Sequence, residues 1–135
     1  MRALKCAAAI ALLVACAGCG RGDDRDTARA VVDRFFAAID AGDGEQACAQ
    51  LSPNTRGELE SREQRPCAEA ITGLELEGAP VERVSIYVLN GIAELASGEA
   101  AFLSQGEQGW RLSAVGCTPE GGKPADRPYD CEVEG

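Results

Sequence analysis

Histidine is absent from this chain of 135 residues, and its absence excludes several kinds of chemistry. Histidine is the usual side chain that titrates near neutral pH and the commonest metal ligand in proteins. Catalysis by Ser/His/Asp or Cys/His groups and most zinc sites are therefore excluded. The sequence predicts no catalytic constellation, no metal site and no cofactor, so we expect a protein that is not an enzyme.

Basic and aromatic residues are also scarce. The chain has 13 basic against 22 acidic residues and a net charge of −9. This balance disfavours nucleic acid as a partner, because binding there depends on basic side chains that neutralise phosphates. It equally disfavours a folded domain that lies on anionic lipid. The acidity is interpreted as an aid to solubility, with an acidic face for a basic partner as the alternative. With six aromatic residues, the core must be mostly aliphatic.

No apolar run near the start reaches the length of about 20 residues that spans a bilayer. Instead, Arg2 and Lys5 precede an uncharged stretch from Cys6 to about Val14, which is typical of a signal peptide. The segment Leu13-Val14-Ala15-Cys16 resembles the bacterial lipobox. That resemblance implies a cysteine that receives diacylglycerol and becomes the mature N-terminus. We expect an exported protein, lipid-anchored at the outer face of the cytoplasmic membrane.

Two cysteines compete for the lipid. Cys16 has the better local match, because Leu13 lies three residues before it. Cleavage before Cys19 would instead leave four cysteines, an even number for two disulfides. Cys16 is favoured, and Cys19 stays open. Residues 1–19 are thus assigned to the signal peptide and lipobox, and the charged, glycine-containing segment 20–26 to a tether.

Helices are predicted for the first part of the domain. Val31, Phe35 and Ile39 recur at helical spacing, which predicts a helix over 27–41 that ends at Gly42. Short helices follow at 44–51, at 53–63 with Ser52 as cap and Pro53 in its first turn, and from Pro66 to Gly73.

Alternating apolar residues predict four strands for the second part. They lie at 81–89, 92–96, 100–104 and 110–115, with Asn90-Gly91 as the first hairpin turn. In the last strand, Trp110, Leu112 and Ala114 should share one face. Helices followed by an antiparallel meander define an α+β class, with the domain at 27–117 and a C-terminal tail at 118–135.

The stretch FFAAIDAGDGEQACAQLSP (35–53) resembles the opening helix pair of the NTF2-like (SnoaL-like) superfamily. Together with PCAEAI (66–71) and GCTPEGGKPADRPYDCEVEG (116–135), it is similar to small, uncharacterised actinobacterial lipoproteins. The resemblance implies a cone-shaped fold that can hold a small ligand, and no particular reaction. Residues that could line the cone are Phe35, Tyr87 and Trp110. Asp40, Asp43 and Tyr87 are the nearest candidates for an acid or base, although helix capping and surface positions explain them better.

Of the seven cysteines, Cys48, Cys67 and Cys117 lie in the expected domain and Cys131 in the expected tail. In an exported protein they are expected to form disulfides rather than a metal site. Of three possible pairings, Cys48–Cys67 and Cys117–Cys131 are favoured: the first joins neighbouring short helices, and the second ties the tail to the last strand. Each loop would contribute roughly 3 kcal/mol of stability.

Three functions remain open at this point. The first is a lipid-anchored binding or interaction module of the cell envelope, whose partner is an envelope protein or a small apolar ligand. The second is a structural envelope protein without a discrete ligand. The third is an enzyme of the SnoaL-like kind, which would need a buried acid in the cone.

Overall fold

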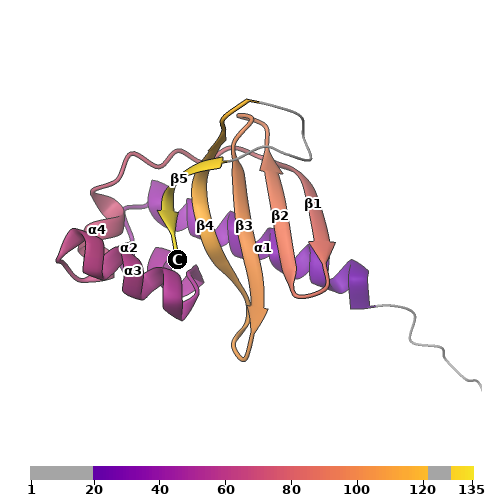
Figure 1. The fold of residues 1–135 in the computed structure, drawn as a ribbon, viewed down its shortest axis with the longest axis horizontal. Helices are drawn as coiled ribbons and strands as arrows, with labels where there is room; N and C mark the ends of the chain where they lie inside the picture. The colour runs from indigo at the N-terminus through magenta and orange to yellow at the C-terminus, as the bar shows by residue number, and fades with distance from the viewer. Residues whose placement is uncertain (1–19, 122–128) are drawn as a thin grey trace, which may run out of the picture.

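Four helices precede one antiparallel sheet in the computed structural model, which describes residues 20–121 and 129–135 (Figure 1). The helices are α1 (Gly20–Asp40), α2 (Gly44–Gln50), α3 (Pro53–Glu63) and α4 (Cys67–Thr72). The strands are β1 (Val81–Tyr87), β2 (Asn90–Leu95), β3 (Ala100–Gly106), β4 (Gly109–Pro119) and β5 (Tyr129–Glu134). They follow one another across an open sheet in the order β1-β2-β3-β4-β5. The α+β class is confirmed, whereas the predicted number of four strands is wrong.

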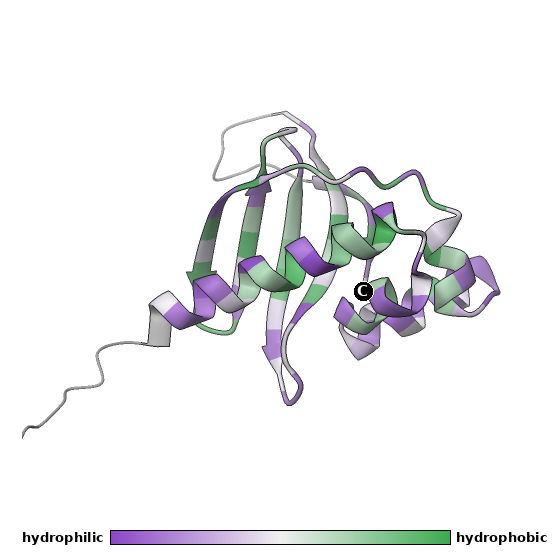
Figure 2. Cartoon of the chain, turned by 180° about the vertical axis from the view of Figure 1, so that it is seen from behind, coloured by the Kyte–Doolittle hydropathy of each residue, from purple (hydrophilic) through white to green (hydrophobic). Residues whose placement is uncertain are grey.

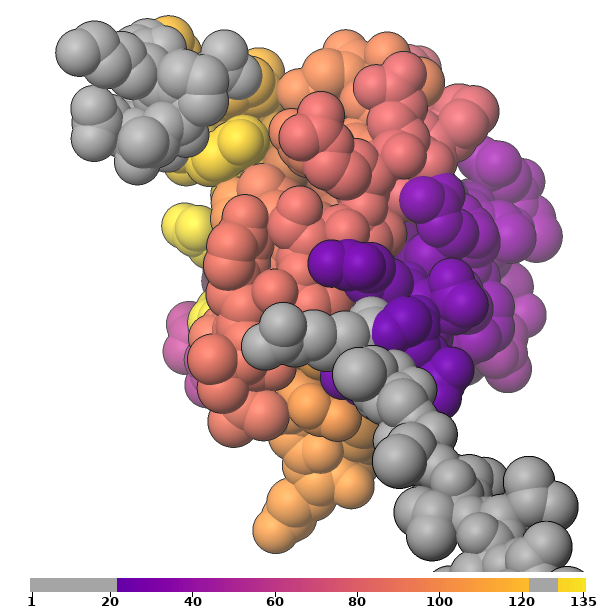
Figure 3. All heavy atoms as spheres, turned by 90° about the vertical axis from the view of Figure 1, so that its right-hand side faces the viewer, coloured from indigo at the N-terminus to yellow at the C-terminus, as the bar shows by residue number. Residues whose placement is uncertain are grey.

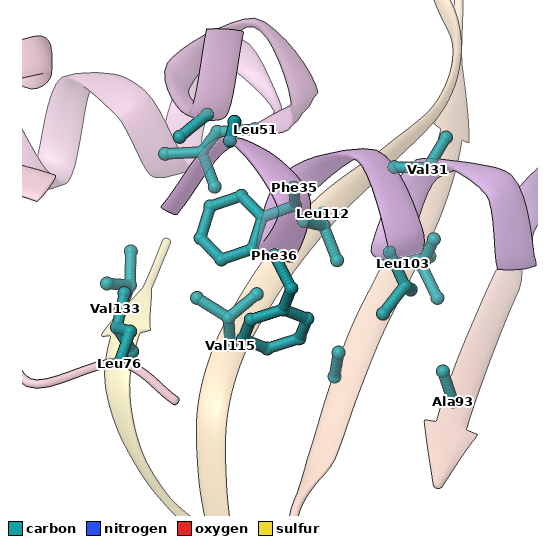
Figure 4. Packing of buried hydrophobic residues seen from close by; sticks show 14 of the residues in the cluster. Val31, Phe35, Phe36, Leu51, Leu76, Ala93, Leu103, Leu112, Val115 and Val133 are labelled. Carbon is teal, nitrogen blue, oxygen red and sulfur yellow. The ribbon is translucent and has the colours of Figure 1, made fainter. Parts of the chain in front are cut away.

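Helix α1 crosses one face of the sheet, which we call the inner face (Figure 2). The predicted apolar stripe is the side that it buries: Val31 and Phe35 are at most 1% exposed. They meet aliphatic side chains of the central strands, among them Leu103 and Leu112 (Figure 4). Burial of such side chains is the main favourable term in folding, so the contact between α1 and the sheet is the principal core.

Helix α1 begins at Gly20 rather than at Thr27, so the prediction of a tether at 20–26 is wrong. Asp24 shows why this segment is ordered. Its Oδ1 accepts a hydrogen bond of 3.1 Å from Nε1 of Trp110, a buried residue at the start of β4. A buried indole N–H requires an acceptor, and Asp24 supplies it from the second turn of the helix.

Helices α2, α3 and α4 form a cluster at the β5 end of the sheet (Figure 1). The predicted caps are confirmed: Gly42 has a φ of 68° after α1, and Ser52 accepts from the Thr55 backbone N–H at the start of α3. Gly44 is buried, and a Cβ there would lie 2.1 Å from the Ala68 carbonyl oxygen. Glycine thus lets α2 approach α4, and the predicted Cys48–Cys67 disulfide joins them.

The first hairpin turns at Val88 and Leu89, not at Asn90-Gly91 as predicted. Tyr87 pairs with Asn90, and Ile86 pairs with Gly91. Gly91 serves close packing instead of a turn: a Cβ there would lie 3.0 Å from Cδ1 of Ile86 and 3.6 Å from Cζ3 of Trp110. A side chain at position 91 would therefore crowd Ile86, its partner across the hairpin, and glycine avoids that contact.

Strand β4 carries two irregularities that overturn its predicted alternation. Leu103 pairs with Leu112, but the next residue back on β3, Phe102, pairs with Ala114, which leaves Ser113 as an extra residue. A second bulge includes Gly116, at a φ of 64°. Because a bulge reverses which residues share a face, Val115 enters the core and Ala114 leaves it.

The C-terminal tail, predicted to lack regular structure, forms the fifth strand. Strand β5 pairs with β4 and contributes Val133, which is fully buried, to the main core. Cys117 lies opposite Cys131 across the two strands, and the predicted disulfide joins them. The folded unit therefore extends beyond 27–117 at both ends. The predicted signal peptide, with Cys16 and Cys19, lies outside the described residues.

None of the helices described is both long enough and apolar enough to cross a bilayer.

Candidate functional site

A broad hollow lies on the outer face of the sheet, opposite the face that α1 covers. It has a volume of about 970 Å³, and we call it the outer-face groove. Strands β3, β4 and β5 form its floor, and α3 forms one wall. Its lining residues are Asn54, Glu58, Ser61, Arg62, Phe102, Ser113, Ala114, Tyr129, Cys131, Glu134 and Gly135.

A second, small apolar cluster makes the floor of the groove. Phe102 and Tyr129 pack edge to face, with ring centroids 5.1 Å apart and planes at 80°. Ala114 and Cys131 belong to the same cluster. Phe102, Tyr129 and Cys131 are only partly buried, so apolar surface stays available to a ligand. The bulge at Ser113 creates this floor, because it turns the small side chain of Ala114 outward beside Phe102.

The wall is fixed to the floor by three hydrogen bonds. Thr55 is fully buried, and its Oγ1 donates to the Ser113 carbonyl over 3.1 Å. The Ser52 backbone N–H donates to the Leu112 carbonyl over 2.8 Å. At the other end of α3, Nη2 of Arg62 donates to the Glu132 carbonyl over 2.7 Å. Helix α3 is thus held to both β4 and β5, and the groove has a defined shape.

Charges of both signs lie on the rim. Glu58 and Glu134 line the groove together with Arg62. Nε of Arg62 also lies 3.1 Å from a carboxylate oxygen of Glu63, so part of its charge is already balanced. An aromatic floor with a mixed polar rim suits an amphipathic ligand or a protein segment, since apolar contacts supply affinity and a few polar groups fix orientation.

The three residues predicted to line a cone do not meet around a cavity. Phe35 is fully buried beneath α1, and Trp110 is 2% exposed and bonded to Asp24. Tyr87 is 65% exposed at the end of β1. None of the three lines the outer-face groove. Helix α1 covers the inner face of the sheet, and Phe35 and Trp110 are buried there in the core.

The candidate acids and bases are likewise dispersed. Asp43 caps α2, where its Oδ1 accepts from the Gln46 backbone N–H over 3.1 Å. Asp40 is exposed near the end of α1 and lines a shallow hollow of about 320 Å³ with Asp33. Tyr87 belongs to the first hairpin. Among the described residues, no group of three His, Cys, Asp or Glu side chains is arranged to hold a metal ion.

The groove residues were missed because the tail was expected to lack regular structure. The signal was present: Tyr129, Cys131 and Val133 alternate with three acidic residues, the period of a strand. The bulge at Ser113, which turns Ala114 outward, has no comparable signal in the sequence.

Comparison with known proteins adds no relationship: no family model matches the chain, and no curated protein or solved structure matches it either.

Proposed function

We propose that this chain is a lipid-anchored protein of the bacterial cell envelope that binds a partner in the outer-face groove. The observation that carries the proposal is the groove itself, which offers half-buried aromatic surface on a wall and floor held rigidly together. The partner is an envelope protein or a small apolar ligand. The lipobox-like segment ending at Cys16, or at the alternative Cys19, supports attachment at the outer face of the cytoplasmic membrane.

The two disulfides support an extracytoplasmic location. Such bonds form and persist in oxidising compartments and are rare in the cytosol. Cys48–Cys67 and Cys117–Cys131 together use all four cysteines of the described residues. An exported chain with a modest core gains stability from both bonds.

A binding role, rather than catalysis, is proposed because Asp40, Asp43 and Tyr87 lie on the surface at separate places. We also propose a distant relationship to the NTF2-like fold, supported by the order of helices before a bent antiparallel sheet with a long helix across one face. The proposed binding site departs from that resemblance, since it lies on the outer face.

The anchor is tested by the intact mass of the protein from its native membranes, together with Cys16→Ser and Cys19→Ser variants. We expect a mass that includes the lipid, which one of the two substitutions removes. Four further cysteines should resist alkylation until they are reduced. An unlipidated wild-type mass would overturn the proposed anchoring.

The groove is tested by photo-crosslinking in the native envelope, with a photoreactive phenylalanine analogue at position 102. The matched control carries the analogue at Glu82, an exposed residue of β1 at the far edge of the sheet. A discrete adduct is expected from position 102 only, and Ser61→Arg on the groove wall should weaken it. Native mass spectrometry of the gently extracted protein detects a small ligand. If both measurements show nothing specific to the groove, a structural role without a ligand replaces the proposal.

A further inference from the structure

Three consecutive large apolar side chains at the β1–β2 hairpin remain in solvent. Tyr87 is 65% exposed, Val88 88% and Leu89 55%, and no other large apolar side chain of the described residues is comparably exposed. We call this segment the apolar tip. Single exposed apolar residues are common, but a contiguous group at the end of a projecting hairpin marks an interaction site.

The apolar tip has a backbone conformation that its residue types disfavour. Val88 has a φ of 58°, in the left-handed region that β-branched residues rarely adopt. Asn or Gly would satisfy this position without strain, yet Asn90 and Gly91 lie in the following strand. Strained backbone of this kind clusters at functional sites, which agrees with a role for the exposed side chains.

The apolar tip is also held firmly. The Leu89 carbonyl accepts a hydrogen bond of 2.8 Å from the Gln105 backbone N–H of β3, and Tyr87 pairs with Asn90. The side chains are therefore presented by a fixed hairpin.

The apolar tip lies at the end of the molecule where α1 begins (Figure 1). Figure 3 shows the start of α1, in indigo, beside the β1 and β2 strands. Gly20 directly follows Cys19 and comes four residues after Cys16. Four extended residues span at most about 14 Å, so a lipid on either cysteine keeps this end of the domain close to the membrane.

Charge indicates what kind of surface the apolar tip meets. The ten residues from Val84 to Ala93 contain no charged side chain. The β3–β4 hairpin projects at the same end, but it carries Glu107 and Gln108 (Figure 1). An uncharged tip that includes a tyrosine suits the boundary between lipid headgroups and acyl chains, where aromatic side chains are enriched. It does not require anionic lipid.

We propose that the apolar tip inserts into the outer leaflet of the membrane that carries the lipid anchor. This inference rests on the proposed anchoring and adds a second point of attachment. The apolar tip joins β1 and β2, whereas α3, β3, β4 and β5 line the groove, so no residue of the groove belongs to the inserted hairpin. The anchored domain then has a fixed orientation instead of free rotation on its lipid.

The test uses the full-length chain extracted from its membranes and reconstituted into phosphatidylcholine vesicles that contain brominated acyl chains, which quench tryptophan. Leu89→Trp reports on the apolar tip, and Gln108→Trp on the polar hairpin at the same end is the matched control. The native Trp110 is buried in both variants. We expect Leu89→Trp to be quenched several-fold more than Gln108→Trp, without dependence on salt or anionic lipid.

Equal quenching of the two variants, or none, would overturn the insertion. An emission shift of Leu89→Trp that depends on protein concentration, without quenching, would also overturn it and indicate a second copy of the chain as the occupant. The intact mass of the same sample separates this inference from the anchor. A lipidated but unquenched protein keeps the proposed anchoring and rejects the insertion. If the protein proves to be unlipidated, quenching after vesicles are added still tests the insertion of the apolar tip, independently of the anchor.

A second substitution separates a functional from a structural role. Val88→Asn in the Leu89→Trp background removes an apolar side chain but suits the left-handed backbone. We expect it to raise the urea midpoint of unfolding and to lower the quenching of Leu89→Trp. Unchanged quenching would show that Val88 does not enter the lipid, and would contradict the proposed tip.

Discussion

The two faces of the sheet differ in how completely they are filled. On the inner face, α1 covers large aliphatic side chains, and Leu103 and Leu112 are at most 1% exposed (Figure 4). On the outer face, the buried residues are small, namely Ala100, Ala114 and Cys117. Two aromatic rings, Phe102 and Tyr129, form part of the floor of an open groove of about 970 Å³.

This difference assigns separate roles to the two faces. Stability depends on apolar area removed from water, which favours the inner face. A binding site needs apolar surface that is not yet covered, which only the outer face retains. The same sheet therefore supplies a core on one side and a candidate site on the other. Substitutions confined to one face of the sheet test this assignment of stability to the inner face and binding to the outer face.

The largest difference is expected between Leu103 and Phe102, neighbours on β3 that face opposite sides. Leu103→Ala should lower the free energy of unfolding by about 2–5 kcal/mol, because it leaves a cavity in a filled core. Phe102→Ala should cost less, since the ring is partly exposed and loses mainly its contact with Tyr129, worth about 0.5–1.5 kcal/mol. Urea unfolding followed by circular dichroism measures both variants.

Crosslinking from a second groove position completes this comparison. Phe102→Ala should reduce capture by a photoreactive analogue placed at Tyr129, whereas Leu103→Ala should leave capture intact while the domain remains folded. A loss of stability from Phe102→Ala equal to that of Leu103→Ala would make the outer face part of the core and contradict the division.

The two disulfides extend the comparison between the filled core and the open groove, with a somewhat smaller expected change in stability. Cys48 and Cys67 are at most 1% exposed, whereas Cys131 is partly exposed beside the groove. Under mild reduction without denaturant, Cys117–Cys131 should open first, because its sulfur can be reached by a thiolate. Its loss should cost roughly 3 kcal/mol in the chain-entropy model. Timed alkylation and peptide mapping give the order, and simultaneous opening of both bonds would show that reduction requires global unfolding.

Much of the fold could be predicted from local signals. The apolar stripe of α1, the caps at Gly42 and Ser52 and both cysteine pairings depend on nearby residues, and all are confirmed. The errors arose where residues distant in the sequence determine the local structure. The start of α1 depends on Trp110, which is 86 residues away from Asp24 in sequence.

The candidate site was less predictable than the fold. Phe102 and Tyr129 lie 27 positions apart and meet because β4 lies between their strands and bulges. The alternation in β5 could have been noticed, but a bulge at Ser113 changes which side chains share a face without any glycine at that position to mark it. A one-residue change of register moves a side chain from one face to the other, so small errors in pairing conceal a surface site.

The bulge at Ser113 determines which side chains of β4 face the core and which face the groove. Thr55 bonds directly to it, so a substitution there tests its contribution. Thr55→Val keeps the shape of the side chain but removes the hydroxyl that donates to the Ser113 carbonyl. The carbonyl still accepts from the Gly135 backbone N–H over 3.2 Å, so we expect a loss of only about 1–2 kcal/mol in urea unfolding. Thr72→Val is the matched control, because that exposed hydroxyl bonds only to carbonyls of its own helix.

Beyond stability, Thr55→Val should loosen α3 from β4 and accelerate amide hydrogen exchange in α3, while the exchange of α1 stays unchanged. If α1 exchanges faster to the same degree, the groove wall and the core unfold together, and the two faces are a single cooperative unit.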